Sequence, residues 1–183
     1  MLKVYKVSKK FEDFQKIKLL YKSSFPRQEQ TPINMLLRRA KKGKAIFNAY
    51  YDEDIFAGFA YIATYNDITF VWYLAVDGVH RSKGYGAQIL NHIKALHPKN
   101  RIALTIEALD ENAKNNAERI KRKDFYIKNS YMSTGILIRL FGMRYEVLTY
   151  GGTCTAQEIL KINKKLLGAV LFAFFKPKIE ESV

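Results

Sequence analysis

The residues whose types and spacing suggest chemistry most clearly form a basic, glycine-containing loop at positions 81–86. The loop follows the apolar run 72–76 and precedes a segment in which apolar residues recur at helical spacing. A strand, loop and helix in this order direct several backbone N–H groups and the positive end of a helix dipole towards one point. Gly84 and Gly86 have no Cβ, so a ligand can approach the backbone closely. The pattern predicts a binding loop for phosphate groups.

Two other phosphate-binding loops fit this segment less well. The dinucleotide fingerprint needs a third glycine and a strand that ends directly at the loop, whereas here the strand ends near Val76. Glu107 does lie about twenty residues downstream, as a ribose-binding acid would, so a nucleotide-dependent oxidoreductase stays open as a disfavoured alternative. A P-loop would place its lysine after the glycine, but Lys83 precedes Gly84.

Residues 74–90, a Leu-Ala-Val strand followed by Arg-x-x-Gly-x-Gly and an amphipathic helix, resemble motif A of the GNAT superfamily of acyl-CoA-dependent N-acetyltransferases. A second segment, 119–131, resembles the family's Phe-Tyr-x-Lys-Asn-Gly-Phe sequence. Departures from that sequence are Ser130 and Tyr131 in place of Gly-Phe, and Arg122 in place of an alanine. The resemblance extends from residue 1 to about 157.

The resemblance implies an α/β fold, with a single domain built on a mixed, mostly antiparallel, twisted sheet of about seven strands flanked by helices on both faces. It implies an N-acetyltransferase that moves an acetyl group from acetyl-CoA, its co-substrate, to a primary amine of a small molecule or peptide by direct attack in a ternary complex. The pyrophosphate would lie on the loop, and the strand backbone would meet the pantetheine amide and the acyl carbonyl. The cofactor-binding residues predicted in this way are Leu74, Ala75, Val76, Arg81, Ser82, Lys83, Gly84, Tyr85, Gly86 and Ala87.

Three further residues are candidates for roles in catalysis or acceptor binding. In the family that this chain resembles, a tyrosine at the position of Tyr126 protonates the leaving thiolate, although Tyr126 also fits a core aromatic beside Phe125. Glu107, at a strand end, is the best candidate for a general base, with a solvated or salt-bridged carboxylate as the alternative. Glu29, in the loop after a Phe-Pro pair, is a weaker candidate for contacting the acceptor.

The length and net charge of the chain limit the number of domains and the classes of partner that we expect. The chain has 183 residues, enough for one domain, and 31 Lys and Arg against 17 acids give a formal charge of +14. Because the charges are spread along the chain without a basic tail, we expect a generally basic protein and regard nucleic acid as an unlikely partner. The main alternative to an enzyme is a basic module that binds nucleic acid or an anionic surface on a catalytically silent version of the same fold.

The single cysteine, the spacing of the histidines and the short apolar runs suggest a cytoplasmic protein without a metal site. Cys154 is the only cysteine, so no internal disulfide can form, and the three histidines lack metal-ligand spacing. No run is long enough to span a membrane, and the N-terminus lacks the apolar core of a signal peptide. The nearest apolar run, 168–175, predicts a C-terminal extension (168–183) after a domain at 1–167. We expect this run to pack on its own domain or to continue the last helix; the alternatives are a homodimer contact and an anchor to a membrane surface.

Periodicity and turn residues place the remaining elements. The expected strands are 2–7, 45–51, 55–65, 69–76, 101–107, 135–140 and 145–150. The expected helices are 11–24, about 32–42, 84–97, 116–129 and one that starts near Thr155. Thr155 and Glu158 have the spacing of a capping box, and Thr31-Pro32 resembles a helix start.

Overall fold

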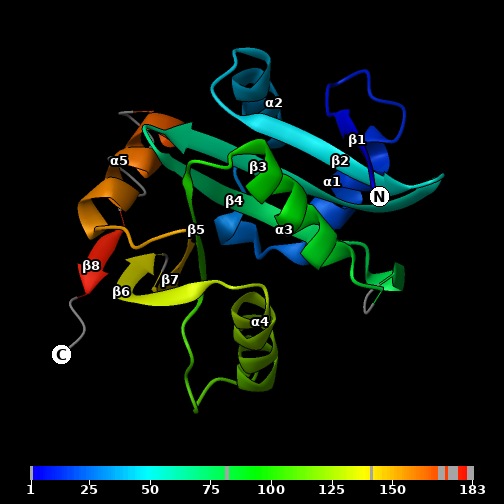
Figure 1. Ribbon diagram of the computed structural model, residues 1–183. Coiled ribbons are helices and arrows are strands. Elements are labelled where there is room, and N and C mark those ends of the chain that lie inside the picture. The colour runs from blue at the N-terminus through cyan, green and yellow to red at the C-terminus, as the bar shows by residue number, and fades with distance from the viewer. Residues whose placement is uncertain (1, 81–82, 141, 169–171, 173–176, 181–183) are drawn as a thin grey trace. The chain divides into compact units, whose positions relative to one another are not determined.

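The computed structural model describes residues 2–80, 83–140, 142–168, 172 and 177–180. Within these residues, eight strands form one mixed, mostly antiparallel sheet in the order β1-β2-β3-β4-β5-β7-β6-β8 (Figure 1). The chain divides into two compact units, residues 1–64 with 71–98 and residues 65–70 with 99–183. The first three residues of β4 belong to the second unit and the rest of β4 to the first.

The first unit contains the N-terminal strands of the sheet. These are β1 (Lys3–Lys6), β2 (Ile46–Asp52), β3 (Ile55–Tyr65) and β4 (Ile68–Val76). β1 pairs antiparallel with β2, and β2 pairs antiparallel with β3, so that Phe47 lies opposite Tyr61. β3 and most of β4 are buried, as their nearly continuous apolar sequences predict.

Helices cover both faces of the strands in this unit. They are α1 (Phe14–Ser24), α2 (Ile33–Lys41), α3 (Tyr85–Leu96) and two 3-10 turns, η1 (Arg27–Glu29) and η2 (Gly78–His80). Tyr21 of α1 packs edge-on against Tyr73, and the Tyr61 hydroxyl donates to the carbonyl of Leu36 in α2. The α3 side is the opposite face, where the Tyr50 hydroxyl lies 3.1 Å from Nδ1 of His92 (Figure 1). Alternation of side chains along β2 places Phe47 on the first face and Tyr50 on the second.

The second unit contains the remaining strands, β5 (Arg101–Glu107), β6 (Met132–Leu140), β7 (Met143–Tyr150) and β8 (Lys178–Glu180). β7 pairs antiparallel with both β5 and β6, and β6 pairs antiparallel with β8. Its helices are α4 (Asn116–Lys128) and α5 (Ala156–Leu167). The predicted capping box at the start of α5 is present, because the Thr155 hydroxyl accepts from the Glu158 N–H and Glu158 accepts from the Thr155 N–H.

The expected fold class is confirmed, with one more strand than expected. β8 was not anticipated, since its three residues follow a run read only as apolar and basic. α2 begins one residue later than expected, with Pro32 rather than Thr31 at the N-cap. Most of the apolar run at 168–175 lies outside the described residues. Within the described part of the chain, every helix is too short or too polar to cross a bilayer.

Candidate cofactor loop and catalytic residues

The loop between β4 and α3 leaves a helix N-terminus open. Gly84 has φ +77° and ψ 6°, a left-handed conformation that favours glycine, and α3 begins at the next residue. The first turn of α3 contains no acidic residue, and no described side chain caps it. A Cβ built on Gly84 meets nothing within 4 Å, so the space beside this backbone is open. The N–H groups of Tyr85, Gly86 and Ala87 are therefore those of an uncapped helix start, which suits an anion.

The cations predicted for this loop are only partly described. Lys83 is exposed beside the start of α3. Arg81 and Ser82 lie outside the described residues, so their predicted contribution stays a prediction.

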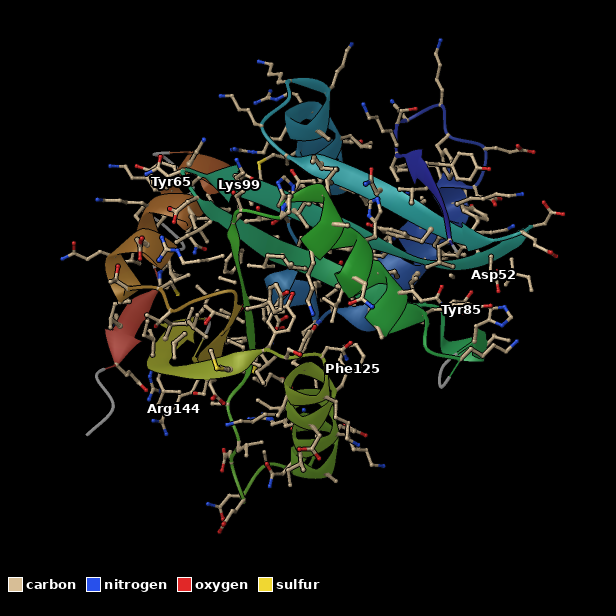
Figure 2. The ribbon with its side chains drawn as sticks, viewed as in Figure 1. Asp52, Tyr65, Tyr85, Lys99, Phe125 and Arg144 are labelled. Carbon is tan, nitrogen blue, oxygen red and sulfur yellow. The ribbon has the colours of Figure 1, made fainter. Side chains whose placement is uncertain are left out.

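Tyr85 anchors the start of α3. Its ring is buried, and its hydroxyl donates a 2.8 Å hydrogen bond to Oδ2 of Asp52 at the end of β2 (Figure 2). This bond to the carboxylate raises the pKa of Tyr85. Because the phenol is directed at Asp52, any contact of Tyr85 with a phosphate would come from its backbone N–H.

The C-terminal end of β4 is closely packed against β3. A Cβ on Gly58 would collide with the carbonyl oxygen of Ala75, so only glycine fits at this position. The Asp77 N–H donates 3.0 Å to the carbonyl of Ala57. Ala75 is buried, whereas Leu74 and Val76 are partly exposed. The end of β4, which is predicted to meet the acyl group, can therefore lie close to β3 only because residue 58 is a glycine.

Tyr73 of β4 fixes the loop that contains Glu29. The Tyr73 hydroxyl lies 2.7 Å from the Glu29 carbonyl oxygen and 3.0 Å from Oγ1 of Thr31, and it accepts from the Thr31 N–H. Tyr21 adds a 2.9 Å bond to the Thr31 carbonyl. The structure therefore fixes the main chain of Glu29, whose side chain is half-buried. These bonds could not be predicted from the sequence, because a tyrosine in a strand does not reveal where its hydroxyl points.

Glu107 ends β5 and is bound by the helix that follows it. Its Oε2 accepts from the Asn115 amide at 3.1 Å and lies 3.3 Å from Arg122 and 3.6 Å from Arg119. Only 11% of the Glu107 side chain is exposed. The carboxylate is therefore ion-paired, which was the alternative considered for it, and its role as a general base stays a prediction.

Tyr126 lies in the last turns of α4 with its side chain buried. Its ring packs edge-on against Phe125 and against Tyr131, with ring centroids 5.1 Å and 5.6 Å apart. Burial raises the pKa of Tyr126 to about 12, against which the charge of Arg122 acts weakly in the opposite direction. The phenol is therefore protonated at neutral pH, as a general acid must be.

A second ion pair on α4 was missed by the sequence analysis. Glu146 of β7 has only 8% of its side chain exposed, and both of its carboxylate oxygens accept from Nζ of Lys123 at 2.8–2.9 Å. Its position within an apolar strand was the available signal, since buried carboxylates are paired in folded proteins. α4 is thus bound to β5 through Glu107 and to β7 through Glu146.

The structure groups the predicted residues by unit. Glu29, the described loop residues and Leu74–Val76 belong to the first unit, and Glu107 and Tyr126 belong to the second. Among the described residues, no group of three His, Cys, Asp or Glu side chains could hold a metal ion.

A sequence profile of the acetyltransferase (GNAT) domain matches residues 42–133, which is half of the chain and includes β4, the glycine loop and α4. The chain belongs to the GNAT family. The family resemblance noted from the two motifs is thereby confirmed. A search of curated proteins gave no match.

Solved structures of other GNAT proteins share the fold. A GNAT-family protein from Bacteroides thetaiotaomicron is 19% identical, with a TM-score of 0.69 over 92% of this chain and 97% of that one. The aminoglycoside 6'-N-acetyltransferase from Enterococcus faecium is 15% identical, with a TM-score of 0.61 over 81% and 96%. Arabidopsis thaliana NAA60 in complex with acetyl-CoA is 13% identical, with a TM-score of 0.61 over 82% and 98%. At these identities the likeness establishes the fold and leaves the acceptor open.

Proposed function

We propose that this chain transfers an acetyl group from acetyl-CoA to a primary amine of a small molecule or peptide, by direct attack in a ternary complex. The observation that carries the proposal is the open start of α3. Gly84 ends the loop in a left-handed conformation, and the amides that follow have no side-chain cap among the described residues. Three N–H groups and the helix dipole at that point suit the pyrophosphate of coenzyme A.

The backbone at the end of β4 is proposed to bind the rest of the donor. Leu74 and Val76 are partly exposed, and the pantetheine amides would pair with this strand as an added strand does. An N–H group here would also stabilise the oxyanion that forms when the amine nitrogen attacks the thioester carbon. Gly58, which allows β3 to approach Ala75 closely, is proposed to keep this stretch of backbone in place.

Proton transfer completes the reaction. The C–N bond forms, the C–S bond breaks, and the departing thiolate takes the phenolic proton, which we assign to Tyr126. A thiol with a pKa near 8.5 can leave as the thiolate, and the raised pKa of Tyr126 keeps its proton available. The attacking amine gives up its own proton to a base or to water.

The base matters only for strongly basic amines. At pH 7, deprotonating an alkylamine of pKa about 10.4 costs about 4.6 kcal/mol, whereas an α-amine near 7.8 costs about 1 kcal/mol. Glu107 is our candidate base, acting directly or through water. Its carboxylate is already ion-paired with Arg119 and Arg122, so we expect acceptors that need little help from a base.

The loop at 24–34 is our candidate for acceptor contacts, with Glu29 as the residue that would meet a cationic amine. Tyr73 and Tyr21 hold the main chain of this loop by hydrogen bonds, so its side chains would contact an acceptor from a fixed backbone. We also propose a reducing, cytoplasmic setting, in keeping with a buried free Cys154.

Calorimetric titration with acetyl-CoA, with NADH as the control ligand, tests the proposal. Micromolar binding of acetyl-CoA alone, followed by release of free thiol when amines are added, is the expected result. Binding of neither ligand would overturn it. Salt-sensitive binding of single-stranded RNA that coenzyme A does not compete would then favour the basic module.

A further inference from the structure

A groove separate from the glycine loop lies between α2 and the strands β1 and β2. Its volume is about 720 Å³, within the range of small-ligand pockets. Its apolar lining comes from Val7, Leu37, Ala40, Ala45, Ile46 and Phe47. All of its lining residues belong to the first unit, and α2 lies along β2 there (Figure 1).

Cations stand on both sides of this groove. Lys6 and Lys9 come from the end of β1 and the turn after it, and Arg38 and Lys41 come from α2. All four are exposed, and the part of the lining that comes from described residues contains no acidic residue. Among the described residues, no carboxylate forms an ion pair with any of the four. The groove therefore has an apolar floor and a cationic rim whose charges are not neutralised by described residues.

We infer that this groove is a docking site for an acidic peptide segment of a partner protein, a segment that inserts an apolar side chain between two lines of carboxylates. Charge complementarity favours several carboxylates over one, because the four cations flank the groove instead of meeting at one point. An extended peptide directs successive side chains to opposite sides, which matches cations on opposite walls.

Other polyanions match the groove less well. Single-stranded nucleic acid is held by aromatic platforms, and the only aromatic residue in the lining, Phe47, is 2% exposed. A membrane surface needs protruding apolar residues, whereas Val7, Ala45 and Phe47 are recessed and buried. A peptide side chain can reach such a floor.

Fluorescence anisotropy with a labelled acidic peptide tests the inference. The probe is a twelve-residue peptide of glutamates with two central leucines, and its comparators replace glutamate by glutamine or leucine by serine. At about 0.1 M salt, we expect saturable binding of the probe and at least about tenfold weaker binding of both comparators. Equal binding of the serine peptide would overturn the proposal, since it would leave only attraction between opposite charges. Equal binding of an oligonucleotide with the same net charge would overturn it as well.

Two variants of α2 locate the site. Arg38→Glu combined with Lys41→Glu reverses one wall of the groove, and Ala40→Phe fills the groove without changing its charge. Each should weaken probe binding about tenfold or more. The matched control, Lys161→Glu with Lys164→Glu, reverses two exposed charges of the same spacing on α5 and should change affinity less than about twofold.

Circular dichroism and thermal denaturation confirm that each variant is folded. Probe binding that survives in both groove variants would overturn the docking site. Acetyl-CoA titration of the same variants should match the unmodified protein, so failure of the docking site can be distinguished from failure of the proposed acetyl transfer.

Discussion

The two regions to which chemistry is assigned are built in different ways. At the start of α3, the groups proposed to bind the cofactor belong to the backbone. The side chains matter there mainly because they leave the backbone accessible: Gly84 has no Cβ, and the first turn of α3 has no acidic residue. On α4, the proposed functional group is the Tyr126 phenol, and side chains distant in sequence hold its helix, through Glu107 on β5 and Glu146 on β7.

This difference determines how each region should respond to substitution. A backbone site is sensitive to any Cβ that changes the main-chain conformation and is indifferent to most side chains. A side-chain site loses its chemistry when one phenol is removed and loses only stability when a supporting ion pair is broken. Substitutions at Gly84, Tyr126, Glu107, Glu146 and Ser130 test this contrast.

The largest expected effect is on the backbone site. Gly84→Val forces a branched side chain into a left-handed conformation and into the open space where a phosphate would lie. We expect the affinity for acetyl-CoA, measured by calorimetry, to fall by about a hundredfold or more. Gly142→Val is the matched control, because Gly142 has φ +80° and equal open space in the turn between β6 and β7. Both variants should lose about 1–2 kcal/mol of folding stability, but only Gly84→Val should lose the ligand.

Removing the phenol of Tyr126 tests the side-chain site. Tyr126→Phe should lower kcat by about a hundredfold while changing acetyl-CoA affinity less than about twofold, because the lost proton donor acts only in the reaction. The control is Tyr131→Phe, the same change at a buried tyrosine that packs against Tyr126. Equal losses in the two variants would show that packing is responsible.

The pH dependence sharpens this test. Because burial raises the pKa of Tyr126 to about 12, its proton is retained through neutral and mildly alkaline pH. Loss of the proton from Tyr126 should therefore cause no fall in kcat below about pH 10. For folding, a raised pKa means that the stabilising contribution is complete below pH 10 and is lost as pH rises towards 12. A fall of kcat near pH 8.5 that Tyr126→Phe abolishes would contradict the assignment.

Substitution of the two carboxylates that form ion pairs with α4 can distinguish a catalytic role from a role in stabilising this helix. Glu107→Gln and Glu146→Gln each break an ion pair to this helix, and each should lower the free energy of unfolding by about 1–3 kcal/mol. If Glu107 is the base, Glu107→Gln alone should reduce kcat about tenfold or more with an alkylamine acceptor at pH 7, and less with an α-amine. Equal kcat values for the two variants would assign Glu107 to support only.

The start of α3 was predicted well from the sequence because a helix start depends on local order. A strand, a loop with glycine at Gly84 and an amphipathic helix specify where the amides point, and the structure has the helix start where it was expected. The bounds of β5 and the capping box of α5 were predicted for the same reason, since alternation and cap residues are local signals.

Contacts between distant residues could not be predicted. The residues around Glu146 do not indicate that Lys123 is its ion-pair partner. The residues around Tyr73 likewise do not indicate its hydrogen bonds to the loop that contains Glu29. β8 was missed because three residues are too few to show a period, and its pairing with β6 is accompanied by ion pairs of Glu180 with Arg139 and Arg144, which are distant in sequence.

The smallest expected effect concerns Ser130, where the sequence departs from the glycine usual in the family. α4 ends in a Schellman motif, because the Tyr131 N–H donates to the Tyr126 carbonyl and the Ser130 N–H donates to the Ile127 carbonyl. Ser130 takes the left-handed position of this motif, with φ +66°. Ser130→Gly should relieve the strain and stabilise the protein by about 1 kcal/mol, seen as a rise in Tm of about 2–4 °C.

Lys128→Gly is the control for Ser130→Gly, because Lys128 is exposed and helical two residues earlier. Glycine there should destabilise the protein by about 0.5–1 kcal/mol, since the added chain freedom relieves no strain. A loss of stability in both variants would mean that Ser130 has a role beyond its backbone conformation. An increase in Ser130→Gly alone, with kcat unchanged, would show that α4 tolerates a backbone change that the start of α3 does not. Backbone conformation at the end of α4 would then affect stability, whereas at Gly84 we propose that it determines ligand binding.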